Sequence, residues 1–120
     1  MTRQYLSIEA FHDLLNKWNG KTIKIVKKEM NDRDEVYMEL DAISYAKDEQ
    51  TIDDYASMYT LQLNGDGQTM TADQYMPLPD SMFEIPLDDD TIYEFNGAAF
   101  VLQTNRGTYK IEQTQQIMPS

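Results

Sequence analysis

The chain has 120 residues, of which 41% are hydrophobic and 26% charged, and its formal net charge at pH 7 is −11. This length fits one domain, and the composition is that of an ordinary folded protein, which excludes a fully disordered chain. The absence of cysteine excludes disulfides, thiolate metal sites and cysteine nucleophiles, and it fits a reducing, cytoplasmic environment. The N-terminus lacks the apolar run of a signal peptide, and no window approaches eighteen consecutive apolar residues, so we expect no export by that route and no membrane span.

The negative charge is concentrated in the middle of the chain. Residues 48–105 contain twelve acids and no lysine or arginine, whereas residues 1–47 contain eight acids and eight bases. Nucleic acids and anionic lipids are bound chiefly through lysine and arginine, so neither is expected as a direct partner. We expect this acidic central region to dock on a basic protein surface, such as that of a nucleic-acid-binding protein, where it would mimic or compete with nucleic acid.

The first predicted element is a short amphipathic helix. Ser7 is a suitable N-cap, Glu9 lies in the first turn, and apolar residues recur at helical spacing through Trp18. Asn19 and Gly20 then favour a left-handed stop. The sequence predicts a helix from about Ile8 to Trp18, with Phe11 and Trp18 anchoring it to the sheet.

Alternation of apolar and polar residues indicates strands in the next part of the chain. Residues 22–30 and 35–46 are predicted to form a hairpin with a turn at residues 31–34. In the second strand, Met38 and Leu40 occupy even positions, whereas Ile43 and Tyr45 occupy odd positions. Side chains at even and odd positions point to opposite faces of a continuous strand, so both sets could not be buried on one face. We therefore expect a bulge or sharp bend near Asp41 and Ala42.

Further strands follow a polar connection. Apolar and polar residues alternate over residues 59–63, which predicts a strand. The two glycines in residues 64–67 favour a tight hairpin turn, and residues 68–76 are expected to form the return strand. Pro86 marks residues 82–87 as an edge strand because proline cannot donate a ladder hydrogen bond.

The last three strands are the clearest. Residues 91–95, 98–104 and 108–113 form a predicted meander, with turns at Asn96–Gly97 and at residues 105–107. We expect a single domain over residues 1–113 and a disordered tail over residues 114–120. The predicted fold class is α+β, mainly β: an N-terminal helix packed on a strongly bent antiparallel sheet of about six to eight strands, either open or closed as a small barrel.

The sequence offers little for catalysis. His12 could serve as a general base, but no paired nucleophile accompanies it, and a half-packed histidine at the edge of the apolar stripe is the preferred interpretation. Adjacent aspartates in a turn are normally solvated, which argues against a carboxylate pair for glycoside hydrolysis. Residues 64–68 lack the further ligands of a calcium loop. We expect no enzyme activity, catalytic residue, cofactor or metal site.

The candidate site is therefore an acidic and aromatic patch that faces the partner. It consists of Asp53, Asp54, Glu84, Asp88, Asp89, Asp90, Tyr93 and Glu94. Tyrosine beside carboxylates offers flat apolar area together with hydrogen bonds, although tyrosine in a small β domain is more often part of the core. The alternative function is small-molecule or peptide binding in the apolar concavity of the curled sheet, with the acidity serving solubility only.

Overall fold

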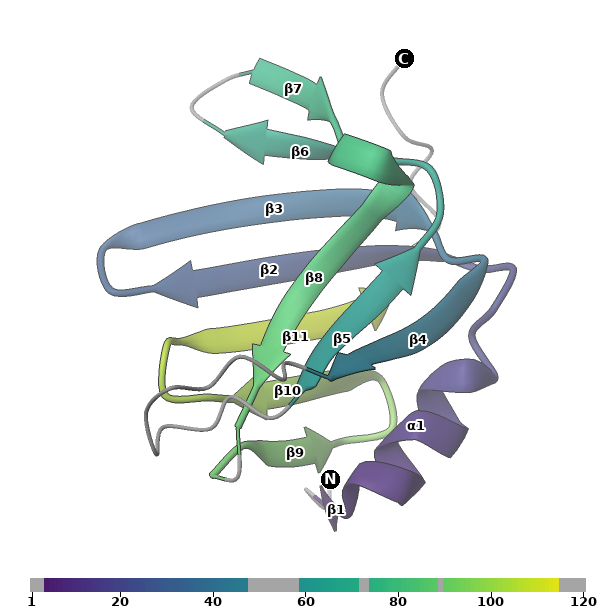
Figure 1. Ribbon diagram of the computed structural model, residues 1–120, viewed down its shortest axis with the longest axis vertical. Coiled ribbons are helices and arrows are strands. Elements are labelled where there is room, and N and C mark those ends of the chain that lie inside the picture. The colour runs from purple at the N-terminus through teal and green to yellow at the C-terminus, as the bar shows by residue number, and fades with distance from the viewer. Residues whose placement is uncertain (1–3, 48–58, 72–73, 89, 115–120) are drawn as a thin grey trace.

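A computed structural model describes residues 4–47, 59–71, 74–88 and 90–114 and shows one α-helix, one short 3-10 helix and eleven strands in those ranges (Figure 1). In chain order the elements are β1 (Gln4–Leu6), α1 (Ile8–Asn16), β2 (Thr22–Glu29), β3 (Asp32–Glu39), β4 (Ala42–Lys47), β5 (Tyr59–Asn64), β6 (Gly67–Thr71), β7 (Gln74–Pro77), η1 (Pro79–Ser81), β8 (Met82–Leu87), β9 (Ile92–Phe95), β10 (Ala99–Gln103) and β11 (Thr108–Gln113). The predicted mainly β composition is confirmed.

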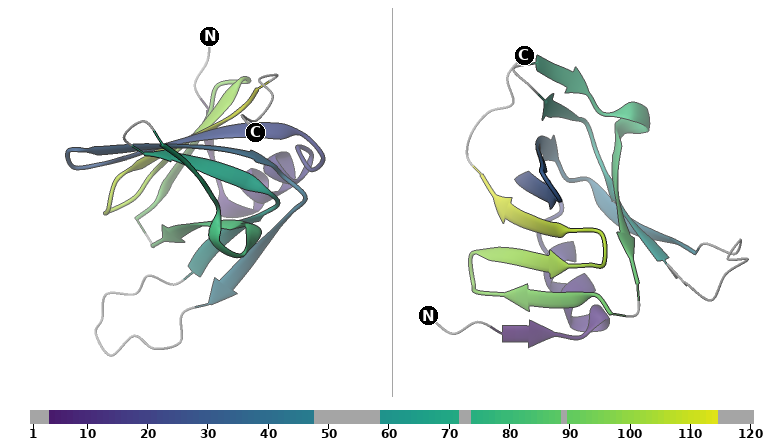
Figure 2. Two further views of the ribbon diagram at one scale, coloured as in Figure 1. Left: turned by 90° about the horizontal axis from the view of Figure 1, so that it is seen from above. Right: turned by 90° about the vertical axis from the view of Figure 1, so that its left-hand side faces the viewer.

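The strands form two antiparallel sheets. The large sheet has eight strands in the order β1-β9-β10-β11-β2-β3-β6-β7, and the small sheet has three in the order β4-β5-β8. The small sheet crosses one face of the large sheet, and α1 lies between the two sheets at one end (Figures 1 and 2). The sheet is strongly bent but is not closed into a barrel, so the open form is the correct alternative.

The helix begins and ends where the sequence predicts, to within two residues. The Ser7 hydroxyl oxygen accepts a hydrogen bond from the backbone N–H of Ala10 at 3.1 Å, which confirms the N-cap. Gly20 has a φ of +88°, the left-handed conformation expected after the helix. Phe11 and Leu15 are fully buried, so the apolar face of α1 closes the space between the sheets.

The core is a single cluster contributed by both sheets and the helix. Its strand residues alternate along the chain, as a half-buried sheet requires. Its members are Phe11, Leu15, Ile23, Ile25, Val36, Met38, Leu40, Leu61, Leu63, Leu78, Ile85, Leu87, Tyr93, Phe100, Leu102, Tyr109 and Ile111.

The bend predicted near Asp41 is the point at which the chain changes sheets. β3 ends at Glu39 in the large sheet, and β4 begins at Ala42 in the small sheet. The parity conflict is resolved because the two apolar sets belong to different sheets. The preceding turn is shorter than predicted, since Glu29 pairs with Asp32 and leaves only Met30 and Asn31 between the strands.

The hairpin predicted around Gly65 and Gly67 is wrong. β5 pairs with β4 and β8, whereas β6 pairs with β3 and β7, so the chain returns to the large sheet at this point. The predicted return strand, residues 68–76, is itself a hairpin of β6 and β7. A Cβ atom on Gly65 would collide with the Glu39 carbonyl oxygen, so glycine is required here by the close passage of the chain beside the end of β3.

The other strand predictions are confirmed with small shifts at the ends. β8, which contains Pro86, is an edge strand of the small sheet, and β9, β10 and β11 form the predicted meander. β1 was not predicted from the sequence. No helix in the described ranges is long and apolar enough to cross a membrane. The residues of the predicted tail after Thr114 lie outside the described part of the chain.

Candidate functional site

Two residues of the predicted acidic patch, Tyr93 and Glu94, are buried in the structure. Tyr93 is only 8% exposed and Glu94 only 5%, so the expectation that these side chains face a partner is wrong. They are adjacent on β9 and point to opposite faces of the sheet. Tyr93 joins the core, with its ring centroid 5.0 Å from that of Phe11, and the Glu94 carboxylate accepts a hydrogen bond from Gln103 Nε2 at 3.1 Å.

Asp88 and Asp90 are neighbours in the turn after β8, where the backbone N–H of Asp90 donates to the Asp88 carboxylate at 2.9 Å. Asp53, Asp54 and Asp89 fall outside the described residues. Asp88 is half-buried and is used in hydrogen bonds within the turn that follows β8.

Glu84 and Asp90 are the two described patch residues with exposed side chains. Glu84 lies on the polar face of the small sheet, where Ser44 donates to Gln62 at 2.8 Å and the Gln62 amide donates to Glu84 at 3.5 Å. Asp90 lies beyond the far end of β8. Their role in partner binding stays a prediction.

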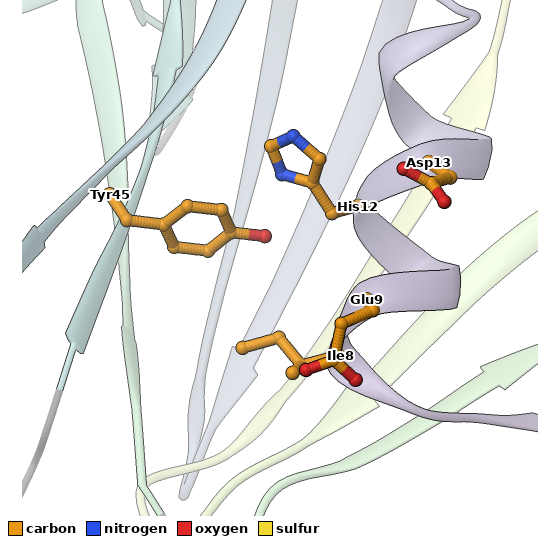
Figure 3. Close-up of a pocket in the computed structure, with 5 residues that line it drawn as sticks. All are labelled: Ile8, Glu9, His12, Asp13 and Tyr45. Atoms are coloured by element: carbon orange, nitrogen blue, oxygen red, sulfur yellow. The ribbon is translucent and has the colours of Figure 1, made fainter.

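A more defined feature is a pocket between α1 and β4. It has a volume of about 400 Å³, is largely apolar, and is lined by Ile8, Glu9, His12, Asp13 and Tyr45. Ile8 and His12 are one helical turn apart, so both side chains project from α1 on the same side. Figure 3 shows the Tyr45 phenol reaching from β4 toward His12 and Ile8.

Two polar atoms in the pocket wall have no hydrogen-bond partner in the described structure. They are His12 Nδ1 and the Tyr45 hydroxyl, and both are shielded from solvent. The two rings lie with their centroids 5.3 Å apart and their planes inclined by 32°. Burial raises the pKa of Tyr45 to about 12, so the phenol is neutral at physiological pH.

The charged groups of the pocket are all acidic. Glu9 and Asp13 are exposed carboxylates on α1, and none of the described lining residues is lysine or arginine. Figure 3 places the Glu9 carboxylate beside Ile8. Ile8 also lines a second hollow of about 350 Å³, and Tyr93 contributes to the wall of that hollow.

Side chains that commonly act as nucleophiles are missing from the described lining of this pocket. The lining contains no serine, threonine, cysteine or lysine nucleophile, and the Tyr45 phenol stays protonated at neutral pH, so it does not supply a phenolate base there. Within the described ranges, no three metal-ligating side chains gather closely enough to hold a metal ion.

Sequence reasoning identified His12 but not the pocket. It treated the histidine as half-packed at the edge of the apolar stripe, and the shared helix face of Ile8 and His12 was visible in their spacing of four. No local signal shows that Tyr45, 33 residues later on another element, lies opposite. This contact depends on the change of sheet between β3 and β4.

Comparison with known proteins assigns the chain to one family. Residues 4–116 match the family described as YmzB-like protein, and the chain therefore belongs to the YmzB-like family. A similar protein is the uncharacterized protein YmzB of Bacillus subtilis (strain 168), which is 29% identical over 99 residues, covering 78% of this chain and 83% of that protein. No solved structure gives a significant match.

Proposed function

We propose that this protein is a non-enzymatic binding protein that takes a small molecule with an apolar body and a polar group into the pocket between α1 and β4. The observation that carries the proposal is an apolar wall that contains two buried polar atoms without partners, His12 Nδ1 and the Tyr45 hydroxyl. Ligand pockets combine these features, because the apolar wall supplies affinity and a few polar groups fix orientation. An unsatisfied buried polar atom costs about 1–3 kcal/mol, which a hydrogen-bonding ligand would recover.

The size of the pocket limits the ligand. Its volume of about 400 Å³ lies toward the lower end of the range for small-molecule sites, which is about 300–1,000 Å³. A single aromatic ring with a short polar chain would fit. Such a ligand would contact Ile8 with its apolar part and reach the phenol or imidazole with its polar group.

Because His12 is the only histidine in the chain, the carbon-bound protons of its ring are an unambiguous NMR probe of the pocket. The experiment titrates the protein with 2-phenylethanol, 2-phenylethylammonium and phenylacetate, which share an aromatic body and differ in charge. We expect a saturable shift of the His12 signals with at least one of them. Ile8→Trp, which fills the pocket, should suppress this shift, whereas Met76→Trp on β7, where the side chain is 55% exposed, should leave it unchanged.

Two results would contradict the proposal. One is the absence of any His12 shift with all three probes, and the other is a shift that persists unchanged in a folded Ile8→Trp variant. If Ile8→Trp does not fold, Tyr45→Phe provides the test. Removing one hydrogen bond worth about 0.5–1.5 kcal/mol should weaken binding about twofold to tenfold, and unchanged affinity would count against the site.

A second candidate function is docking on a basic protein surface through the acidic central region. It is favoured by the positions of the ion pairs, which in the described part of the chain lie only on β2, β3 and β11. The exposed acids of the central region have no ion pair in that same part of the chain. They are Asp66, Asp80, Glu84 and Asp90, and they follow the length of β8. No ion pair in the described ranges neutralises these four carboxylates, and their negative field would attract a cationic partner, such as a nucleic-acid-binding protein.

This candidate predicts steep salt dependence. A partner captured from the native host at low salt should be released at high salt, because exposed charges are screened beyond about 8 Å at physiological ionic strength. Replacing two acids beside β8, Glu84→Gln with Asp90→Asn, should weaken capture more than Asp32→Asn with Glu39→Gln, which removes the same charge from exposed positions on β3. An affinity for the partner that does not change with salt concentration would contradict this candidate function. Equal losses of partner capture in the two double variants would contradict it as well.

A further inference from the structure

We infer that the ligand of the pocket between α1 and β4 is an organic cation, an ammonium ion carried on an aromatic or aliphatic body. Its apolar part would lie between Ile8 and Tyr45, and its charge would lie at the rim beside Glu9 and Asp13. This inference rests on the proposed function above and adds the chemical class of the ligand.

The charge of the rim is the first argument. Glu9 and Asp13 are four residues apart on α1, so their carboxylates lie on neighbouring turns at the edge of the pocket. Lys17 lies one turn further along, and the structure pairs it with neither acid. The described lining contains two carboxylates and no lysine or arginine, so it would repel an anionic ligand and attract a cation.

The aromatic wall is the second argument. The rings of Tyr45 and His12, with centroids 5.3 Å apart, give the pocket flat aromatic surfaces. A cation near the face of a tyrosine ring gains about 0.5–1 kcal/mol at an exposed site. A combination of aromatic rings and carboxylates therefore suits an ammonium group better than a neutral polar group.

The hydrogen-bonding chemistry of the rim agrees with this assignment. An ammonium group has donors and no acceptor, so it requires oxygen or imidazole nitrogen acceptors. The carboxylate oxygens of Glu9 and Asp13 supply such acceptors at the rim, whereas the Tyr45 hydroxyl and His12 Nδ1, which have no partner in the described structure, are shielded from solvent in the wall. The carboxylates of Glu9 and Asp13 are exposed, so the charge can stay partly hydrated and avoid the cost of a buried, unpaired ion.

The test compares the affinities of the same three probes at pH 8, where an ordinary histidine is neutral, with the His12 ring signals as the readout. We expect the dissociation constant of 2-phenylethylammonium to be about threefold to tenfold lower than that of 2-phenylethanol, and phenylacetate to bind weakest. The double variant Glu9→Gln with Asp13→Asn should remove the preference for the ammonium probe. The matched control, Asp32→Asn with Glu39→Gln, should keep it.

Salt gives an independent readout. Because the two carboxylates are exposed, the advantage of 2-phenylethylammonium over 2-phenylethanol should shrink at high salt, while the affinity for the alcohol itself should change little. If the advantage of 2-phenylethylammonium over 2-phenylethanol were the same at low and high salt, that result would contradict a binding site for the charge at the exposed rim.

The possible failures are distinguishable. If none of the probes shifts the His12 signals, the proposed binding function fails together with this inference. If 2-phenylethanol or phenylacetate binds as tightly as 2-phenylethylammonium, the pocket binds ligands but the assignment to cations is overturned. A preference that persists in a folded Glu9→Gln, Asp13→Asn variant overturns it as well, because the charge would then be recognised elsewhere.

Discussion

The Asp88 carboxylate accepts a hydrogen bond from the backbone N–H of Asn105 at 3.1 Å and thereby joins the turn after β8 to the turn between β10 and β11. Its other oxygen accepts hydrogen bonds from the backbone N–H of Asp90 at 2.9 Å and from the Thr91 hydroxyl at 3.2 Å. The two turns meet where the chain passes from the small sheet to the large sheet. Asp88 therefore stabilises this junction with both of its oxygen atoms.

Replacing Asp88 with alanine should destabilise the fold. Hydrogen bonds to a charged group contribute about 1.5–3 kcal/mol, and the loss should appear as a lower midpoint of urea unfolding. Asp90→Ala is the matched control, because its exposed side chain can be removed while its backbone N–H remains, and a change within about 0.5 kcal/mol is expected. Equal midpoints for the two variants would show that the carboxylate of Asp88 contributes nothing to the junction.

Two glycines with positive φ should respond differently to substitution. Gly65 has a φ of +150°, and a Cβ atom there would collide with the Glu39 carbonyl oxygen, so Gly65→Ala should cost about 3 kcal/mol or more. Gly97 has a φ of +93°, and its Cβ would meet no atom within 4 Å, so Gly97→Ala should cost only the backbone strain of about 1–2 kcal/mol. Unfolding midpoints in urea measure the difference. Similar costs would mean that the chain at Gly65 can move away from β3.

The parts of the fold that depend on local signals could be predicted from the sequence. The cap at Ser7, the left-handed Gly20 and the meander of β9, β10 and β11 each follow from residues within a few positions of one another. The bend near Asp41 was also predictable, because parity along a strand is a local property. These elements were sufficient to define the fold class.

Strand pairing between distant segments could not be predicted in this way. The glycines around Asp66 favour any tight turn, and only the contact with Glu39 shows that the chain crosses to the other sheet there. The burial of Tyr93 and Glu94 was missed for a related reason. Alternation correctly implies opposite faces for Tyr93 and Glu94, but it does not reveal that Gln103 covers the carboxylate on the outer face.

The anchoring of α1 gives a further prediction. Phe11 is fully buried, with its ring centroid 5.3 Å from that of Phe100 in an edge-to-face arrangement, so Phe11→Ala should cost about 3–5 kcal/mol. Trp18 is half-buried, and its ring centroid lies 4.8 Å from that of Phe100. Trp18→Ala should therefore lower the free energy of unfolding by less, about 1–3 kcal/mol. Urea midpoints measure both. A Trp18→Ala variant that keeps its midpoint while losing partner binding would assign Trp18 to an interface.

The stability of the protein should fall at alkaline pH because of buried tyrosines. Burial, with smaller contributions from Tyr45, Asp88 and Glu9, raises the pKa of Tyr93 to about 12. The unfolded chain ionises this tyrosine near pH 10, so the folded state retains the proton to higher pH than the unfolded state. The stabilisation is present in full below pH 10 and is lost as the pH rises toward 12, with a slope of up to about 1.4 kcal/mol per pH unit.

Tyr93→Phe isolates this contribution, because phenylalanine keeps the ring contact with Phe11 and removes the ionisable group. Urea midpoints measured from pH 9 to about 11.5 should fall more steeply for the natural sequence than for Tyr93→Phe. Tyr45, whose pKa burial also raises to about 12, is present in both proteins, so the difference between the two curves reports Tyr93 together with its interaction with Tyr45. Parallel curves would mean that the Tyr93 hydroxyl reaches solvent at the hollow beside Ile8 and ionises without unfolding.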